Sequence, residues 1–233
     1  MPKNWMRSLE ISNPVQVVLC PKIASGNVMS DNPTGLTLSQ AFLKRSMDVM
    51  GSILGLTLTS WIILPAFLAA SIDTRSNGFF RQERVGRHGK VFKVIKLRTM
   101  RSVQGLDTTV TTGKDQRITA LGKFWRKTKI DELPQLINIL LGQMSFVGPR
   151  PDVPGFADKL QGDDRIVVGV RPGITGPATL KYRDEETLLA SINDPERYNR
   201  EVIWPDKVRL NKEYIQNWSF YQDLKYIWKT VVG

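Results

Sequence analysis

Two adjacent acidic residues, Asp131 and Glu132, lie in a part of the chain that is otherwise rich in lysine and arginine. The surrounding residues 128–135 read Thr-Lys-Ile-Asp-Glu-Leu-Pro-Gln, and an apolar pattern with helical spacing follows at once. A hard cation such as Mg²⁺ binds carboxylate and phosphate oxygens together, so paired acids among bases suit a site for a phosphorylated substrate. In the first turn of a helix, however, the same acids would complement the dipole and cap backbone N–H groups.

Basic residues from separate segments favour the first interpretation, since all of them are expected to converge on the acids. They are Lys96, Arg98, Arg126, Lys129 and Arg150. The first two share one face of a predicted strand because side chains alternate along a strand, although a solvated strand face would look the same. Arg150 lies between two prolines, which restrict the backbone on both sides of it. Its guanidinium would therefore be presented from a rigid segment, and a guanidinium can bind phosphate oxygens. A purely structural turn is the alternative there.

The composition restricts the classes of protein that fit. The chain has 233 residues, a net charge of +11 and 41% hydrophobic residues, which predicts a globular protein with an anionic partner. A nucleic-acid-binding protein would explain the charge, but not a long uncharged run or an acidic pair. The single Cys20 is interpreted as incidental, and the single His88 as a turn residue.

Residues 49–72 carry no charge and would span ~36 Å as a straight helix, enough to cross a hydrocarbon core of ~30 Å. We therefore expect membrane insertion, because the buried core helix of a soluble protein is usually shorter and has a polar face. Basic residues flank both ends of the run, so the positive-inside rule gives no direction. A helix bent at Pro65 that enters and leaves one leaflet, and a simple span kinked there, both satisfy these observations.

The remaining pattern predicts a mainly helical chain with short strands. Residues 79–100 favour a hairpin around an Arg-His-Gly-Lys turn, and residues 104–115 favour an irregular loop. A short basic helix is expected at 118–127, with Leu121, Phe124 and Trp125 on its apolar side, and a second helix is expected to begin at the acids. Residues 206–230 read as an aromatic and lysine-rich helix that either packs into the core or lies at a bilayer interface. The turn around Arg171 is interpreted as scaffold.

Several motifs occur in a fixed order over residues 40–230, and together they resemble those of the bacterial sugar transferases, the monotopic polyprenyl-phosphate phosphoglycosyl transferases. They are Lys44-Arg45-x-x-Asp48, Phe79-Phe80-Arg81-Gln82-x-Arg84-Val85-Gly86, Lys96-x-Arg98-Thr99-Met100, Asp131-Glu132-Leu133-Pro134-Gln135, Gly142-x-Met144-Ser145, Val147-Gly148-Pro149-Arg150-Pro151, Arg171-Pro172-Gly173-Ile174-Thr175-Gly176 and Tyr214…Trp218…Asp223-Leu224.

This resemblance implies an α/β, mainly helical fold with a re-entrant membrane helix and a compact catalytic domain on the cytoplasmic face of the bacterial inner membrane. The implied reaction moves a sugar 1-phosphate from a nucleotide diphosphate sugar, usually a uridine one, to undecaprenyl phosphate, with Mg²⁺ as cofactor. By similarity Asp131 is the nucleophile that forms an aspartyl-phosphosugar intermediate, and Glu132 helps to bind the metal. Phosphate charge would be neutralised by Lys96, Arg98, Arg126 and Arg150.

The resemblance also locates the break of the membrane helix, which family members place at a Ser-Pro pair. The equivalent position here is Ser60, and the proline follows later at Pro65. The expected organisation is a leader at 1–38, the membrane helix at 39–75 and the catalytic domain at 76–233. Inner-membrane lipids are expected partners, nucleic acid is not, and a homo-oligomer is left open. No motif distinguishes one transferred sugar from another, and a non-enzymatic membrane adaptor is the alternative function.

Overall fold

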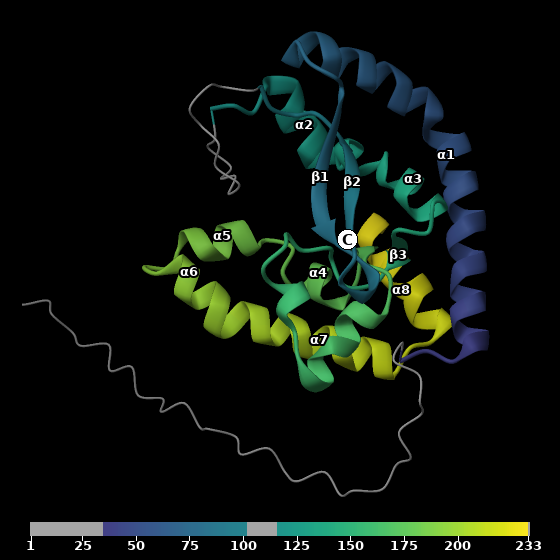
Figure 1. The fold of residues 1–233 in the computed structure, drawn as a ribbon. Coiled ribbons are helices and arrows are strands. Elements are labelled where there is room, and N and C mark those ends of the chain that lie inside the picture. Colours follow the sequence, from purple (N-terminus) through teal and green to yellow (C-terminus); the bar gives the residue numbers. More distant parts are fainter. Residues whose placement is uncertain (1–34, 102–115, 233) are drawn as a thin grey trace, which may run out of the picture. The chain divides into compact units, whose positions relative to one another are not determined.

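The computed structural model describes residues 35–101 and 116–232, all of which lie in a unit that spans Asn32–Gly233. The described chain is mainly helical with short strands, as predicted (Figure 1). The loop predicted at 104–115 lies outside the described residues. The helices are α1 (Leu38–Thr74), α2 (Ala120–Thr128), α3 (Gln135–Leu140), α4 (Pro177–Lys181), α5 (Glu185–Ala190), α6 (Pro195–Tyr198), α7 (Trp204–Gln216) and α8 (Phe220–Val232). The strands are β1 (Phe79–Val85), β2 (Val91–Leu97), β3 (Ser145–Val147) and β4 (Gly173–Thr175).

Short helical turns connect several of these elements. They are η1 (Arg87–Gly89), η2 (Ile130–Glu132), η3 (Ala157–Lys159), η4 (Gly162–Gly169) and the π-helical turn η5 (Asn199–Ile203). The predicted hairpin is confirmed, since β1 and β2 pair in antiparallel fashion with η1 between them. His88 has a φ of 59° in this turn, so it is a turn residue as interpreted.

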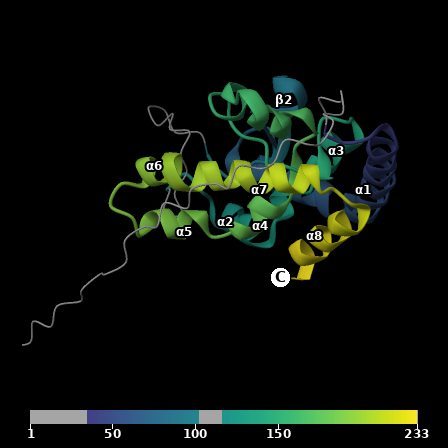
Figure 2. The same cartoon turned by 90° about the horizontal axis from the view of Figure 1, so that it is seen from below.

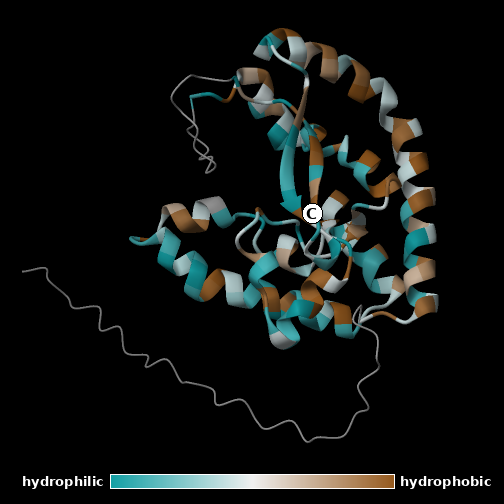
Figure 3. Ribbon diagram, in the orientation of Figure 1, coloured by the Kyte–Doolittle hydropathy of each residue, from teal (hydrophilic) through white to brown (hydrophobic). Residues whose placement is uncertain are grey.

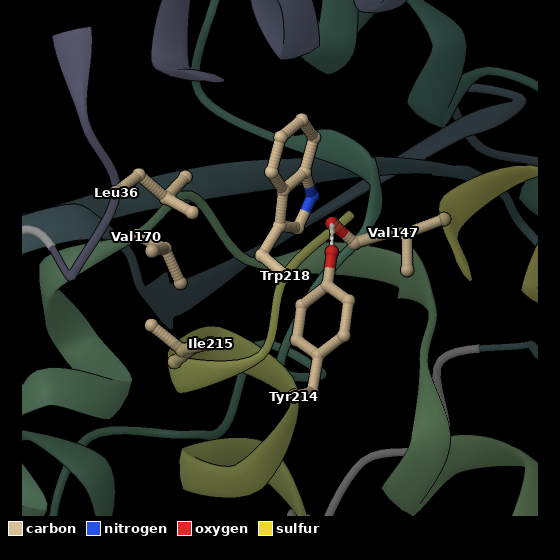
Figure 4. Close-up of a cluster of buried hydrophobic side chains, with 6 residues drawn as sticks. All are labelled: Leu36, Val147, Val170, Tyr214, Ile215 and Trp218. Atoms are coloured by element: carbon tan, nitrogen blue, oxygen red, sulfur yellow. Dashed lines mark hydrogen bonds between the residues drawn. The ribbon is translucent and has the colours of Figure 1, made fainter. Parts of the chain in front are cut away.

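The second sheet carries the Pro-Arg-Pro segment. Strands β3 and β4 are parallel, with Val147 opposite Thr175. Where β3 ends, Gly148 and Gly173 pass so close to each other that a side chain on either would collide with backbone. Figure 4 shows that Tyr214 points at Val147, within a buried cluster that also contains Trp218. The cluster and the backbone contact together fix the point from which the Pro-Arg-Pro segment leaves the sheet.

The long helix α1 has two different faces. Its buried side is made mostly of small, polar or charged residues; the buried residues are Lys44, Asp48, Ser52, Ile63, Ala66, Ala70 and Thr74. Its exposed side is apolar and includes Met50, Ile53, Leu54, Leu58, Trp61, Leu64, Leu68 and Ile72. Apolar segments accordingly recur along the length of α1 in Figure 3. The helix is long and apolar enough to be embedded in a membrane. Its exposed apolar side is the surface that would contact lipid there.

The helix α1 runs without interruption through both positions at which a break was expected. Ser60 donates its hydroxyl to the carbonyl of Thr57 at 3.1 Å, a local bond that is compatible with a helix. Pro65 lacks an N–H, and it is accommodated inside the helix. Figure 1 shows that α1 curves strongly rather than breaking.

Both halves of α1 pack on the rest of the same unit. Near its beginning, Lys44 Nζ lies 2.6 Å from Asp223 Oδ2 of α8, a fully buried ion pair. Near its end, Ala66 and Ala70 join a core cluster with Leu97 of β2 and Trp125 of α2. The two ends of α1 are therefore attached to the same body of protein.

The C-terminal region forms two helices instead of the single helix predicted for residues 206–230. The break falls between α7 and α8, which run separately in Figure 2. Tyr214 and Trp218 are buried on one side of the break, whereas Tyr221 and Trp228 on α8 are 74% and 67% exposed. The core packing is thus confirmed for Tyr214 and Trp218, whereas the exposed aromatics of α8 leave the bilayer interface as a prediction for that helix. On α2, Trp125 is buried as expected but Phe124 is 54% exposed.

Candidate active site

The two acids lie in a helical turn of their own, η2, and not in the first turn of the following helix as predicted. Lys129 ends α2 in the left-handed conformation, with a φ of 60°, and this reverses the chain into η2. The N–H of Leu133 then bonds the carbonyl of Ile130 at 3.2 Å, which closes the turn before α3 begins. Because the acids stand outside α3, capping of that helix does not explain them.

Glu132 is held by two cations. Its Oε1 lies 3.2 Å from Lys96 Nζ and 3.4 Å from Arg150 Nη2. Burial alone would raise the pKa of the Glu132 carboxyl, but Lys96, Arg150 and the nearby Lys129 lower it to about 2. Glu132 is therefore ionised at any physiological pH, and its charge fixes the two cations beside the turn.

Asp131 has a different environment from that of its neighbour. Its side chain is buried, and its Oδ1 has no hydrogen-bond partner among the described residues. Burial, reinforced by the negative charge of Glu132, raises the pKa of the Asp131 carboxyl, while Lys96, Lys129 and Arg126 act in the opposite direction. A buried carboxylate oxygen without a partner costs free energy, so such an atom is typical of a group that reacts or binds a ligand.

The predicted cations divide into two groups. Lys96 and Arg150 contact Glu132 directly, and burial lowers the pKa of the Lys96 ammonium despite the opposing charge of Glu132. Arg126 lies near Asp131 and is held by Thr99 Oγ1 at 2.9 Å. Its guanidinium also lies 3.1 Å from the sulfur of Met100.

Arg98 is directed elsewhere. Its Nε donates to the carbonyl of Asn77 at 2.8 Å, and its guanidinium lies over the ring of Phe80. Strand alternation predicted that it shares the face of Lys96, but β2 ends at Leu97, so the alternation does not continue to Arg98. The structure therefore brings Lys96, Arg126 and Arg150 to the acids and does not bring Arg98 to them.

A half-buried acid close to Arg150 in the chain, Asp152, was not identified from the sequence. Burial raises the pKa of Asp152 to about 6, although Lys207, Arg84 and Arg150 oppose this shift. The backbone of the same segment is tied to β1, because Val85 N–H donates to the Asp152 carbonyl at 2.8 Å. Arg84 also donates to the carbonyl of Pro151 at 3.3 Å. An acid directly after Pro-Arg-Pro was the signal that could have singled out Asp152.

Asn138 was missed because it looks like an interruption of the apolar pattern of α3. It is fully buried, and its amide bonds the exposed edge of β2 much as a neighbouring strand would. Its Oδ1 accepts from Ile95 N–H at 3.0 Å, and its Nδ2 donates to the Lys93 carbonyl at 2.8 Å. This pair of bonds sets the position of α3, and with it the acids, relative to Lys96 on β2.

Arg45 and Arg171 hold the far end of α3. Arg45 donates to the carbonyls of Ile139 and Leu140 at 2.7 and 2.8 Å, and Arg171 donates to the carbonyl of Gly142 at 2.8 Å. Unpaired carbonyls at a helix C-terminus favour such cationic partners. The interpretation of Arg171 as scaffold agrees with this contact.

The acidic pair is suited to Mg²⁺. No group of three or more acidic, histidine or cysteine side chains that could hold a metal ion occurs in the described part of the chain. Magnesium does not require one, because it commonly binds one or two carboxylates and completes its shell with water and substrate phosphates. Oδ1 of Asp131 is buried without a hydrogen-bond partner among the described residues, whereas Oε1 of Glu132 is already bound by two cations.

The amino-acid sequence is similar to those of known proteins over most of its length. The family model described as bacterial sugar transferase matches residues 39–233. The UDP-glucose:undecaprenyl-phosphate glucose-1-phosphate transferase of Escherichia coli K12 is 35% identical over 207 residues, which cover 85% of this chain and 41% of that protein. The undecaprenyl-phosphate galactose phosphotransferase of Salmonella typhimurium is 32% identical, over 82% of this chain and 40% of that protein.

A shorter relative matches over most of its own length. The uncharacterized sugar transferase EpsL of Bacillus subtilis is 36% identical over 190 residues, which cover 81% of this chain and 85% of that protein. The chain thus spans about two fifths of the longer relatives and nearly all of the shorter one.

Proposed function

Because the chain belongs to the bacterial sugar transferase family, we propose that it is a phosphoglycosyl transferase acting on undecaprenyl phosphate. The donor in this proposal is a uridine diphosphate sugar, and the products are undecaprenyl-diphosphate-sugar and uridine monophosphate. The similar proteins from E. coli and S. typhimurium carry names that state such a reaction. The observation that carries the proposal is the buried, unpartnered oxygen of Asp131 among basic side chains.

The proposed reaction has two steps, and Asp131 takes part in both. First, its carboxylate attacks the sugar-proximal phosphorus, the bond from that phosphorus to the bridging oxygen breaks, and the nucleoside monophosphate leaves with that oxygen. Then a phosphate oxygen of the lipid attacks the same phosphorus and releases the Asp131 carboxylate unchanged. Covalent catalysis of this kind splits one difficult transfer into two easier ones. It also allows a water-soluble donor and a lipid acceptor to use one site in turn.

The neighbouring side chains supply the positive charge that this chemistry needs. Glu132 keeps Lys96 and Arg150 beside the reacting phosphate, and Arg126 approaches from the side of Asp131. Charges fixed before the reaction stabilise the transition state without having to reorganise. When bound at Asp131 and Glu132, Mg²⁺ would neutralise phosphate charge and polarise the phosphorus–oxygen bond.

We further propose that α1 is re-entrant, with both ends on the cytoplasmic side of the bacterial inner membrane. The support is that both halves of the helix pack on one unit while the opposite side presents large apolar residues along its whole length. A helix that crossed the bilayer would have to leave that unit at one end. The exposed aromatic side of α8 would rest at the same interface, since Trp and Tyr favour the headgroup region.

A transfer assay tests the proposed function. The purified protein in detergent, with Mg²⁺, undecaprenyl phosphate and a panel of nucleotide sugars, is expected to release a nucleoside monophosphate and form a lipid-linked sugar diphosphate. Asp131→Asn should abolish both products, whereas Asp163→Asn, which changes an exposed acid of η4, should leave them unchanged. A membrane adaptor would form neither product, and the behaviour of Asp131→Asn would then equal that of the wild type.

A further inference from the structure

A cavity of about 820 Å³ lies between α4, the beginning of α5, and α8. Its size is within the roughly 300–1,000 Å³ that is usual for small-molecule sites. Neither of the two acids lines it, so it is separate from the turn that carries Asp131. The lining residues are Pro177, Leu180, Lys181, Tyr182, Arg183, Asp184, Glu185, Leu188, Tyr226, Trp228, Lys229 and Val232.

One wall of the cavity is part of the outward-facing side of α8. Trp228 and Val232 line the cavity and are 67% and 62% exposed. They continue a stripe of exposed apolar residues that begins with Phe220 and Tyr221, at the helical spacing of one face. A hydrocarbon chain could therefore pass from this stripe into the cavity without leaving apolar surface.

The opposite wall is formed by α4 and α5, and basic residues of both walls lie at the edge of the cavity. Leu180 and Leu188 contribute aliphatic surface from α4 and α5. Lys181 is neutralised by Asp206 at 2.6 Å, but neither Arg183 nor Lys229 forms an ion pair with any described residue. Arg183 instead donates to the Lys229 carbonyl at 3.3 Å, which joins the two walls. Asp184 also lines the cavity, so its charged edge is mixed, and the apolar part of the lining is what suits a hydrocarbon chain.

Charged residues connect this cavity to the active site. Glu185 lines the cavity and is paired with Lys207 at 2.6 Å. The charges of Lys207, Glu185 and Arg150 all act on the half-buried carboxyl of Asp152. Since Arg150 in turn contacts Glu132, charged side chains link the cavity electrostatically to the Pro-Arg-Pro segment.

We propose that this cavity binds the isoprenoid chain of the lipid acceptor where that chain leaves the membrane surface. The inference rests on the proposed function, and it assigns the acceptor to α4, α5 and α8. It also gives α8 a role besides contact with lipid, because its exposed stripe would guide the acceptor to the cavity. Aromatic and aliphatic side chains bind isoprenoid units through buried apolar area, which requires no specific hydrogen bonds.

The test compares substitutions inside and outside the cavity on the full-length protein. Trp228→Ser and Leu188→Ser alter opposite walls, and each is expected to raise the KM for undecaprenyl phosphate about tenfold, as the loss of well-buried apolar contact predicts. The control is Tyr221→Ser, which removes an equally exposed aromatic from the same stripe about 10 Å away along α8. Its acceptor KM should change less than about twofold. The KM for the nucleotide sugar should be unchanged in all three variants.

Three results would overturn the inference. Equal effects of Trp228→Ser and Tyr221→Ser, with none for Leu188→Ser, would mean that α8 only contacts the bilayer. A raised KM for the nucleotide sugar would assign the cavity to the donor instead. Unchanged acceptor KM in both cavity variants, with normal wild-type transfer, would refute the acceptor site and leave the proposed function intact. Wild-type protein that forms no lipid product at all would refute the proposed function itself. Circular dichroism of each variant excludes misfolding as the cause of a loss.

Discussion

Asp131 and Glu132 are neighbours in the chain, yet their surroundings push their pKa values apart. Burial and the adjacent charge raise the pKa of Asp131, while three cations lower that of Glu132 to about 2. Opposite shifts in a pair of carboxyls are typical of sites in which the two groups have different roles. The carboxylate with the higher pKa is the stronger nucleophile once ionised, and it also has the unpartnered oxygen. Glu132 is the group that keeps the cations in place.

This difference predicts the pH dependence of the reaction. Only ionised Asp131 can attack phosphorus, so activity should rise with pH through its pKa. Lys96 lowers that pKa, and Lys96→Met should therefore move the acidic limb of kcat/KM to higher pH. The matched control is Lys93→Met, which removes the same charge from an exposed side chain on the other face of β2. An acidic limb that stays in place in Lys96→Met would show that another group is titrating.

For the active-site residues, the sequence predicted that the acids and most of the cations come together, but it did not predict the contacts that position each side chain. The acids and Lys96, Arg126 and Arg150 come together as expected, because their types and order carry the signal. The position of Arg98 could not be predicted, since it depends on where β2 ends and on the carbonyl of Asn77. Asp152 depends on burial, which is a property of the folded chain.

At the scale of elements, the active site depends on how α3 is attached to β2. Asn138 makes the attachment with two backbone hydrogen bonds, and Arg45 of α1 holds the other end of α3. One short helix, α3, therefore couples the acids to the strand that carries Lys96 and to the long helix α1. Movement of α3 would separate Glu132 from Lys96.

Replacement of Asn138 tests this coupling. Asn138→Leu keeps the volume but leaves Ile95 N–H and the Lys93 carbonyl buried without partners, which should cost about 2–4 kcal/mol of unfolding free energy. The activity should fall as well, because the distance between Glu132 and Lys96 is no longer fixed. Ser191→Ala serves as control, since its hydroxyl makes an exposed bond within its own turn. Denaturant unfolding in detergent measures both variants, and equal stability would contradict the role of Asn138.

Element types were easier to predict than their limits and packing. The hairpin followed from its turn residues and β-rich strands, and α1 followed from its uncharged length. The break between α7 and α8 has no proline or glycine to mark it; it is fixed by buried Asp223, which accepts bonds from Tyr214, Trp218 and Lys44. The apolar pattern shows none of these polar contacts, and that of Lys44 joins residues 179 positions apart, so one continuous helix was predicted.

At the scale of the whole described unit, α1 is the element that is long and apolar enough to be embedded in a membrane. The re-entrant proposal predicts that both ends of α1 are cytoplasmic. In a background with Cys20→Ser, cysteines introduced by Ser39→Cys and Arg75→Cys, both at exposed positions, report on the two ends. Membrane-impermeant maleimide should label neither position in intact spheroplasts and both after permeabilisation. Labelling of one end in intact spheroplasts would mean that α1 crosses the bilayer.

The most direct test of the account is the intact mass of the protein after incubation with Mg²⁺ and nucleotide sugars in the absence of lipid acceptor. We predict a mass gain equal to one sugar phosphate, absent in Asp131→Asn and discharged when undecaprenyl phosphate is added. The donor that produces the adduct also identifies the transferred sugar. Release of nucleoside monophosphate only after lipid is added, without a prior adduct, would contradict the covalent role of Asp131.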